Sequence, residues 1–459
     1  MNVYLLLRSA TKARRDDLGS TSVVIPPHGP TVVPRRGSLR PPTRGTTLVR
    51  REEFSMPISP LTTLPRLHSA SRRHVLRGSV AVAAAGGVVV AAGRTSAVGS
   101  ESLPAWSDPA TWGTSGVPRS GSLVVVDFPV LLDQDVDLAG LHIECGGHVV
   151  VDPSRSVTIR TTGNVEVCGL LEMRPASPQV EHLLRFDGID ESRFVGGGMK
   201  VLASDVGLWI HGTGRLDLHG SVRTPWVRAA GALAAGDRTI RLRTEPVGWR
   251  VGDELVITPT GSPVDSRQAE RFDAAKITSI AGSVVTLAAA LRFGHGQVAV
   301  GDGHVLTAEV MNLTRNVRIE GTPGGRTHTM AMHVTEPSEV RFAAFRHFGP
   351  RQADGQYTEK VLGRYGFHWH MCEDGSRGSL LEGVVMRDGG NHAYVPHLSH
   401  GVTLRSCISY DTVETPYWWD LPADTRAIFE PTHDTTFDSC IAAKVVSDPA
   451  FRGFRLVGF

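Results

Sequence analysis

From Ala105 onward the chain consists of short runs of Val, Ile, Leu and Thr, separated every few residues by Gly, Asn, Asp or Pro. The stretch SLVVVDFPVLLD (122–133) is typical of this pattern. Such runs favour strands, and the residues between them favour turns. No long segment shows the 3.6-residue apolar period of a helix. The sequence therefore predicts an almost wholly β body.

Several of these segments resemble one another. Residues 381–388 (LEGVVMRD) superpose on 404–411 (LRSCISYD) at an offset of 23, and 340–347 (VRFAAFRH) fits the same frame. The triplet Ser-Cys-Ile at 406–408 recurs at 439–441, and nearer the start 141–151 superposes on 157–167 at an offset of 16. Self-similarity of this kind predicts stacked β coils.

The coil pattern divides the chain. Residues 226–304 alternate differently and predict hairpins, that is, a small β insertion between coil regions at 105–225 and 305–459. The chain ends within what looks like another coil, and an open coil end needs a cap. We therefore expect a truncated product.

The first hundred residues differ from the rest. Residues 1–70 are rich in Arg, Pro and Ser and predict a disordered leader, with translation expected to start at Met56. Residues 71–97 hold SRRHVLR and a short apolar run, and this segment resembles a bacterial twin-arginine signal. We expect export by the twin-arginine machinery, without a stable membrane anchor, to the cell surface or medium.

Charge separates the leader from the body. Residues 1–100 carry 15 Lys+Arg and 4 Asp+Glu, whereas the remainder carries 33 and 42. A nucleic-acid binder needs a basic face on its folded part, so the acidic body argues against nucleic acid as a partner. The five cysteines show neither zinc-site nor redox spacing, and buried thiols are the expected state of most of them.

Motifs in the body resemble a known family. They are WSDPATW (106–112), the Cys-Gly-Gly turn at 145–147, LWIHGTGRLDLHGS (208–221), GWRVGDELVITPT (248–260) and GRYGFHWH (363–370). Together they resemble the eight-glycine domain and the cell-migration-inducing, hyaluronan-degrading proteins with their bacterial relatives. The resemblance implies a right-handed parallel β-helix of the pectin-lyase type. It also implies action on an extracellular polysaccharide.

The offset of 23 predicts a site. It places His397 above Asp420, and the preceding coil contributes His370. Equivalent side chains of neighbouring coils lie about 4.8 Å apart, so these three can converge on one ion or one substrate atom. Two imidazoles and a carboxylate suit one divalent metal ion such as zinc or manganese. A solvated ladder without chemistry is the alternative.

Further residues join this hypothesis. Period 2 places His368 beside His370, with Phe367 and Trp369 pointing into the core. Arg364 can bind a uronate carboxylate or form a structural ion pair. Asp411, Glu414 or Asp388 can supply a second carboxyl beside Asp420. Asp388 and Asp411 occupy equivalent positions, so turn capping is the alternative for both. Two positions depart from the family motif: Gly366 replaces a proline, and Glu414-Thr415 replaces Gly-His.

The function expected from these residues is hydrolysis of glycosidic bonds in a hyaluronan-like polysaccharide, with His370, His397 and Asp420 at the centre, assisted by His368, Arg364 and Asp411. A polysaccharide lyase is a second hypothesis, since the fold also serves β-elimination. A non-catalytic module that binds glycan or a cell surface is the third.

Overall fold

The computed structural model describes residues 5–6, 88–90, 103–261, 270–301, 303–354, 357–418 and 430–446. The predicted leader and export signal lie outside these ranges, apart from the short strands β1 (Leu5–Leu6) and β2 (Val88–Val90). Among the described residues, no helix has the length and apolar character needed to span a membrane.

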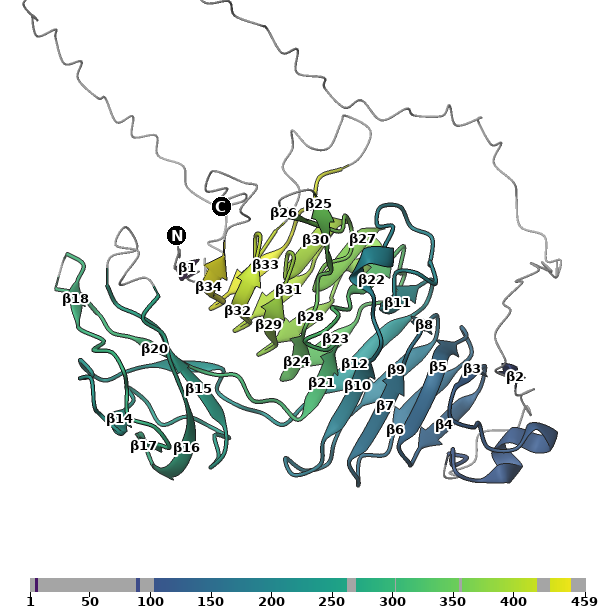
Figure 1. The fold of residues 1–459 in the computed structure, drawn as a ribbon, viewed down its shortest axis with the longest axis horizontal. Coiled ribbons are helices and arrows are strands. Elements are labelled where there is room, and N and C mark those ends of the chain that lie inside the picture. Colours follow the sequence, from purple (N-terminus) through teal and green to yellow (C-terminus); the bar gives the residue numbers. More distant parts are fainter. Residues whose placement is uncertain are drawn as a thin grey trace, which may run out of the picture. The chain divides into compact units, whose positions relative to one another are not determined.

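The strands of the main body stack in parallel pairing into three columns, here called faces. Each coil contributes its strands to the faces in the same order (Figure 1). The first face comprises β4 (Pro129–Leu132), β6 (His148–Val151), β9 (Leu170–Met173), β12 (Arg215–His219), β23 (Glu339–Arg341), β28 (Leu380–Glu382), β31 (Thr403–Arg405) and β33 (Thr436–Asp438). The second comprises β7 (Val157–Thr161), β10 (His182–Phe186), β21 (Val317–Glu320), β24 (Ala343–Arg346), β29 (Val385–Gly389), β32 (Ile408–Val413) and β34 (Ile441–Val446).

The third face carries the predicted site. It comprises β8 (Val165–Val167), β11 (Leu208–His211), β22 (Thr329–Met332), β27 (Phe367–Glu373) and β30 (Tyr394–Ser399). At the first coils, β5 (Val136–Ile143) pairs in parallel with β3 (Ser122–Val126), β7 and β8, and so joins the second face to the third. The chain is a parallel β-helix, which confirms the predicted fold class.

The pairing register tests the internal repeats. Leu381 pairs with Leu404, and Ile408 pairs with Ile441, as the superposed segments predict. The offset of 16 near the start was wrong, because Leu141 pairs with Val165, 24 residues on. Residues 157–167 cover parts of two faces, whose similar sequences reflect a shared alternation rather than stacking.

An antiparallel unit interrupts the coils between β12 and β21. Its strands are β13 (Trp226–Arg228), β14 (Thr239–Arg241), β15 (Glu254–Ile257), β16 (Asp273–Ala281), β17 (Val284–Leu287), β18 (Val298–Ala299), β19 (Val305–Leu306) and β20 (Glu309–Asn312). It buries its own apolar cluster, which includes Leu255, Ile277 and Val310. The predicted β insertion is therefore present, and its last strand ends at Asn312 rather than near residue 304.

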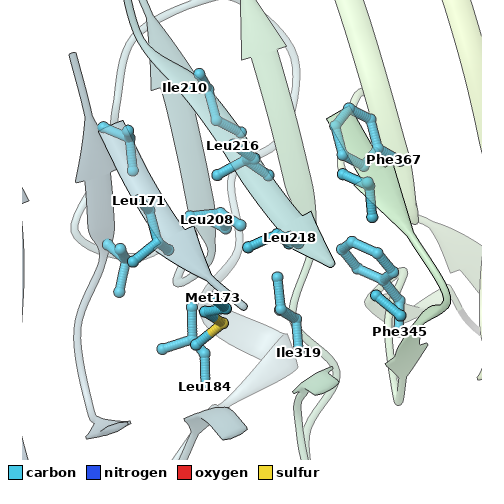
Figure 2. Close-up of a cluster of buried hydrophobic side chains, with 14 of the residues drawn as sticks. Leu171, Met173, Leu184, Leu208, Ile210, Leu216, Leu218, Ile319, Phe345 and Phe367 are labelled. Carbon is cyan, nitrogen blue, oxygen red and sulfur yellow. The ribbon is translucent and has the colours of Figure 1, made fainter. Parts of the chain in front are cut away.

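The core of the β-helix is built from alternate residues of each face. In β9, Leu171 and Met173 are buried while Leu170 and Glu172 are half-buried. Figure 2 shows side chains from several coils meeting in this interior, among them Leu184, Leu218 and Phe345. Burying each such side chain contributes roughly 1.5–3 kcal/mol, which makes the stacked interior the main source of stability.

Smaller elements decorate the coils. A hairpin of β25 (Arg351–Asp354) and β26 (Tyr357–Lys360) lies between β24 and β27 in the chain. Three 3-10 helices are described, η1 (Pro109–Ser115), η2 (Glu191–Arg193) and η3 (Asp374–Ser376).

The cysteines follow two patterns. Cys145 and Cys168 form a disulfide, a pairing that the sequence analysis did not predict. The two positions are 23 residues apart, and stacking of coils brings them together. Cys372, Cys407 and Cys440 are free and buried, as expected.

Because the coils share one apolar core, truncating a buried side chain of one coil should lower the free energy of unfolding. Leu404 of β31 is fully buried between Leu381 and Phe437 of the neighbouring coils. We predict that Leu404→Ala lowers the free energy of unfolding by about 2–5 kcal/mol, measured by denaturant titration. Thr403→Ala, at the half-buried position beside it, should cost less than about 1 kcal/mol; equal losses would contradict the assigned register.

Candidate functional site

The two histidines of β27 lie on the outer side of the third face. Side chains alternate along a strand, and Phe367 and Trp369 are both buried in the apolar core. His368 and His370 therefore point the other way, as predicted. Their ring centroids are 4.9 Å apart.

The next coil adds a third imidazole. His370 pairs with His397 of β30, and their ring centroids are 4.8 Å apart. The Nδ1 atoms of these two residues are separated by 2.9 Å. One nitrogen from each of His368, His370 and His397 lies within 4.8 Å of the others, so the three rings form one cluster. The predicted pairing of His370 with His397 is thus confirmed.

His368 is the most constrained member of this histidine cluster. Its Nδ1 lies 2.9 Å from the carbonyl oxygen of Gly363, which can only accept, so Nδ1 carries the proton and donates. Its Nε2 is buried and has no hydrogen-bond partner among the described residues. The side chain thus holds a lone pair in an enclosed position, an arrangement typical of metal-ligating histidines.

The cluster favours neutral imidazoles. Burial, followed by the proximity of His397, lowers the pKa of His370 to about 3. Burial, followed by the proximity of His370 and His397, lowers the pKa of His368 well below its usual value. Neutral imidazole is the form that binds metal ions, so these rings are ready to act as ligands at neutral pH.

An aromatic ring and a hollow flank the cluster. Tyr417 is buried and stacks on Tyr394 in the core, whereas the half-buried ring of Trp418 lies 5.8 Å from that of His397.

On the other side of the histidine cluster lies an open pocket of about 420 Å³. It is lined by Met199, Val201, His211, Gly212, Met332 and His333. It adjoins the cluster because Met332 pairs with His370.

Arg364 does not face a ligand. Its side chain is fully buried, and Nε donates to Oδ2 of Asp205 at 2.8 Å. A second nitrogen donates to the carbonyl of Gly197, and the guanidinium lies over the ring of Trp209. The hypothesis of uronate binding is therefore replaced by its alternative, a structural ion pair. The partner, 159 residues away, carries no sequence signal.

Asp411 also lies away from the cluster. It belongs to β32 of the second face, where it pairs with Lys444 at 2.5 Å. Both Asp411 and its counterpart Asp388 have left-handed backbone, with φ of 54° and 57°, which short polar residues tolerate best. The structural alternative thus holds for Asp411 as well, and the catalytic assignment is corrected.

The remaining positions named in the sequence analysis have different outcomes. Asp420 lies outside the described residues, so its place in the column stays a prediction. Gly366 is enclosed, since a Cβ there would lie 2.4 Å from the carbonyl oxygen of Ala393. Glu414, where the family motif has Gly-His, is nearly buried and pairs with Arg351 at 3.1 Å and Lys360 at 3.3 Å.

Fold and site together define a class: a parallel β-helix with a cluster of three histidines on its outer surface. No family model matches the chain. Human fibrocystin-L is 27% identical over 353 residues, which is 67% of this chain and 8% of that protein. Mouse fibrocystin-L is 25% identical over 67% of this chain and 8% of its own length. Mouse fibrocystin is 29% identical over 47% and 5%.

The chain thus spans less than a tenth of these relatives. Among solved structures it is similar to the tailspike gp49 of Pseudomonas phage LKA1, at 11% identity and a TM-score of 0.19, covering 68% of this chain and 54% of that one. The tailspike Gp54 of Acinetobacter baumannii bacteriophage AP22, in complex with capsular saccharide, has 9% identity and a TM-score of 0.18, with 64% and 50% covered. At these scores the likeness carries no argument, and the fold rests on the strand pairing.

The position of Arg364 gives a prediction that separates a structural from a substrate-binding role. Arg364→Ala leaves the buried carboxylate of Asp205 without its ion-pair partner and should lower the free energy of unfolding by about 3–5 kcal/mol. Denaturant titration measures this loss. Arg346→Ala, which removes an exposed ion pair with Asp388, should cost less than about 1 kcal/mol. Unchanged stability of the Arg364 variant would contradict the assignment.

Proposed function

We propose that this chain is an exported protein that hydrolyses glycosidic bonds of an extracellular, hyaluronan-like polysaccharide at a divalent metal ion held by His368, His370 and His397. The observation that carries the proposal is the buried Nε2 of His368, which has no hydrogen-bond partner among the described residues. It belongs to a cluster in which one ligand atom from each of the three imidazoles lies within 4.8 Å of the others. Export rests on the twin-arginine motif of residues 71–97, and the substrate class rests on the sequence resemblance.

The geometry favours a metal centre over a ladder of hydrogen-bonded histidines. In a ladder each ring nitrogen would have a partner, and a buried acceptor left without one costs about 1–3 kcal/mol. Two nitrogens that bind one ion at about 2.0–2.1 Å lie roughly 3 Å apart, which suits the Nδ1 atoms of His370 and His397. The donation from His368 to Gly363 would orient the third ligand.

Each residue has a role in this proposal. The three imidazoles hold the ion, which when bound acts as a Lewis acid toward water or a sugar oxygen. Trp418, beside His397, offers a ring face on which a pyranose can stack. Asp420, which the 23-residue offset places level with His397, is the candidate for the proton-transferring carboxyl.

One observation favours a second candidate, metal-dependent glycan binding without cleavage. Glycoside hydrolases usually use two carboxyl groups, and Asp411, the predicted second carboxyl, pairs with Lys444 on another face of the β-helix. Products distinguish the possibilities. Hydrolysis yields saturated ends, whereas a lyase yields ultraviolet-absorbing unsaturated ends, and a binding module retains glycan without shortening it.

His397→Ala should remove one ligand, and with it depolymerisation, while leaving the fold intact. We expect at least a 100-fold loss of activity on hyaluronan together with loss of the bound metal, measured by viscometry and elemental analysis. Chelation of the wild-type protein should abolish activity, and added Zn²⁺ or Mn²⁺ should restore it.

His219→Ala is the matched control, since this half-buried imidazole belongs to the first face. It should leave metal content and activity unchanged. Undiminished activity of His397→Ala would defeat the proposed function. Retained binding of hyaluronan, with no cleavage even by the metal-loaded wild type, would favour the binding module.

A further inference from the structure

A second group of ligating side chains lies apart from the histidine cluster just described. It consists of His400, Glu430 and His433, whose ligand atoms lie within 4.8 Å of one another. His400 follows β30 at the turn toward β31, while Glu430 and His433 precede β33. No motif in the sequence indicates this grouping, because 30 residues separate His400 from Glu430.

His400 is held firmly by the coil. The residue is only 4% exposed, its backbone N–H donates to the carbonyl of Glu373, and its own carbonyl accepts from the hydroxyl of Ser376. Its Nδ1 is buried and, within the part of the chain that the structure describes, has no hydrogen-bond partner. A fixed imidazole with a buried unpaired nitrogen needs a partner that the described protein does not supply.

His433, in the segment directly before β33, lies against His400. The two rings stack with centroids 3.8 Å apart and planes inclined by 20°. The carbonyl of His433 accepts from the N–H of Gly401, and the hydroxyl of Thr432 donates to the carbonyl of Pro396. Both contacts attach this segment to the end of β30, so the stacked rings are positioned by backbone on both sides.

The surrounding carboxylates complete the group. Nδ1 of His433 lies 3.2 Å from Asp434, and Nε2 lies 3.4 Å from Glu430. A carboxylate on one ring nitrogen orients the other nitrogen toward an ion, as in many zinc sites. Among the described residues, the carboxylates of Asp374, Asp434 and Glu430 lie at this group together with the guanidinium of Arg377, which pairs with Asp374 and Asp434. The local charge therefore favours a cation.

We propose that His400, His433 and Glu430 form a second divalent-cation site, of the nitrogen- and oxygen-ligated type that zinc prefers, which fastens residues 430–434 to the turn between β30 and β31. This site is structural and does not depend on the proposed function. Its ion would hold the residues that directly precede β33, which pairs with β31.

Stoichiometry of Zn²⁺ binding tests the proposal on the full chain. The protein is stripped with chelator and titrated with Zn²⁺ by calorimetry, and with Co²⁺ to record the visible absorption of each bound ion. His433→Ala and Glu430→Gln are suitable variants, because both side chains are partly exposed, at 37% and 73%. Each variant should bind one of the ions at least tenfold more weakly. Each should also show a smaller rise in the thermal unfolding midpoint when Zn²⁺ is added.

Variants of the histidine cluster keep the two hypotheses separate. A His370→Ala, His397→Ala double variant should still bind the ion at His400 and His433, whether or not the proposed function holds. His304→Ala, an exposed imidazole of the insertion, serves as the control and should change nothing. The second site is overturned if His433→Ala binds Zn²⁺ with the wild-type number and affinity, or if the double variant binds none.

Discussion

Parallel pairing of successive coils is the constraint on which the rest of this molecule depends. Each coil repeats the same order of faces, so a residue is paired with its equivalent one coil away, and the repeat is 23 residues from β28 to β31 and from β29 to β32. The alternation along each strand then divides every face into an inner column, which builds the apolar core, and an outer column. Stacked Tyr394 and Tyr417 show this rule in the interior, and His370 beside His397 shows it on the outer side.

The same constraint explains how a strand with an apolar inner column can carry histidines on its outer side. Phe367 and Trp369 anchor β27 in the core, and this fixes the outward direction of the histidines between and after them. His368 is nonetheless almost wholly enclosed. Its Nδ1 donates to the carbonyl of Gly363, and its Nε2 has no partner in the part of the chain that the structure describes. Such enclosure keeps the imidazole neutral and its Nε2 available, a combination that costs stability unless something binds there.

Much of this follows from the sequence, and the exceptions have physical causes. The coil period, the inward Phe367 and the pairing of His370 with His397 were predictable, because pairing and alternation are local rules. Arg364 was misassigned as a ligand-binding residue, since nothing in sequence reveals that Asp205 neutralises it. The Cys145–Cys168 disulfide could have been predicted, because a separation of 23 residues is close to the length of one coil. His368 was predicted to assist, whereas its orphaned nitrogen makes it a candidate ligand. The pair His400 and His433 was missed because the longer connection before β33 breaks the period.

Anomalous diffraction from crystals of the protein tests most directly whether the outer histidines hold an ion. Data collected on both sides of the zinc absorption edge, after incubation with Zn²⁺, should show an anomalous peak about 2.0–2.1 Å from the Nε2 of His368 and shared with His370 and His397. A map without density there, in which the three rings bond only to one another and to water, would contradict the account.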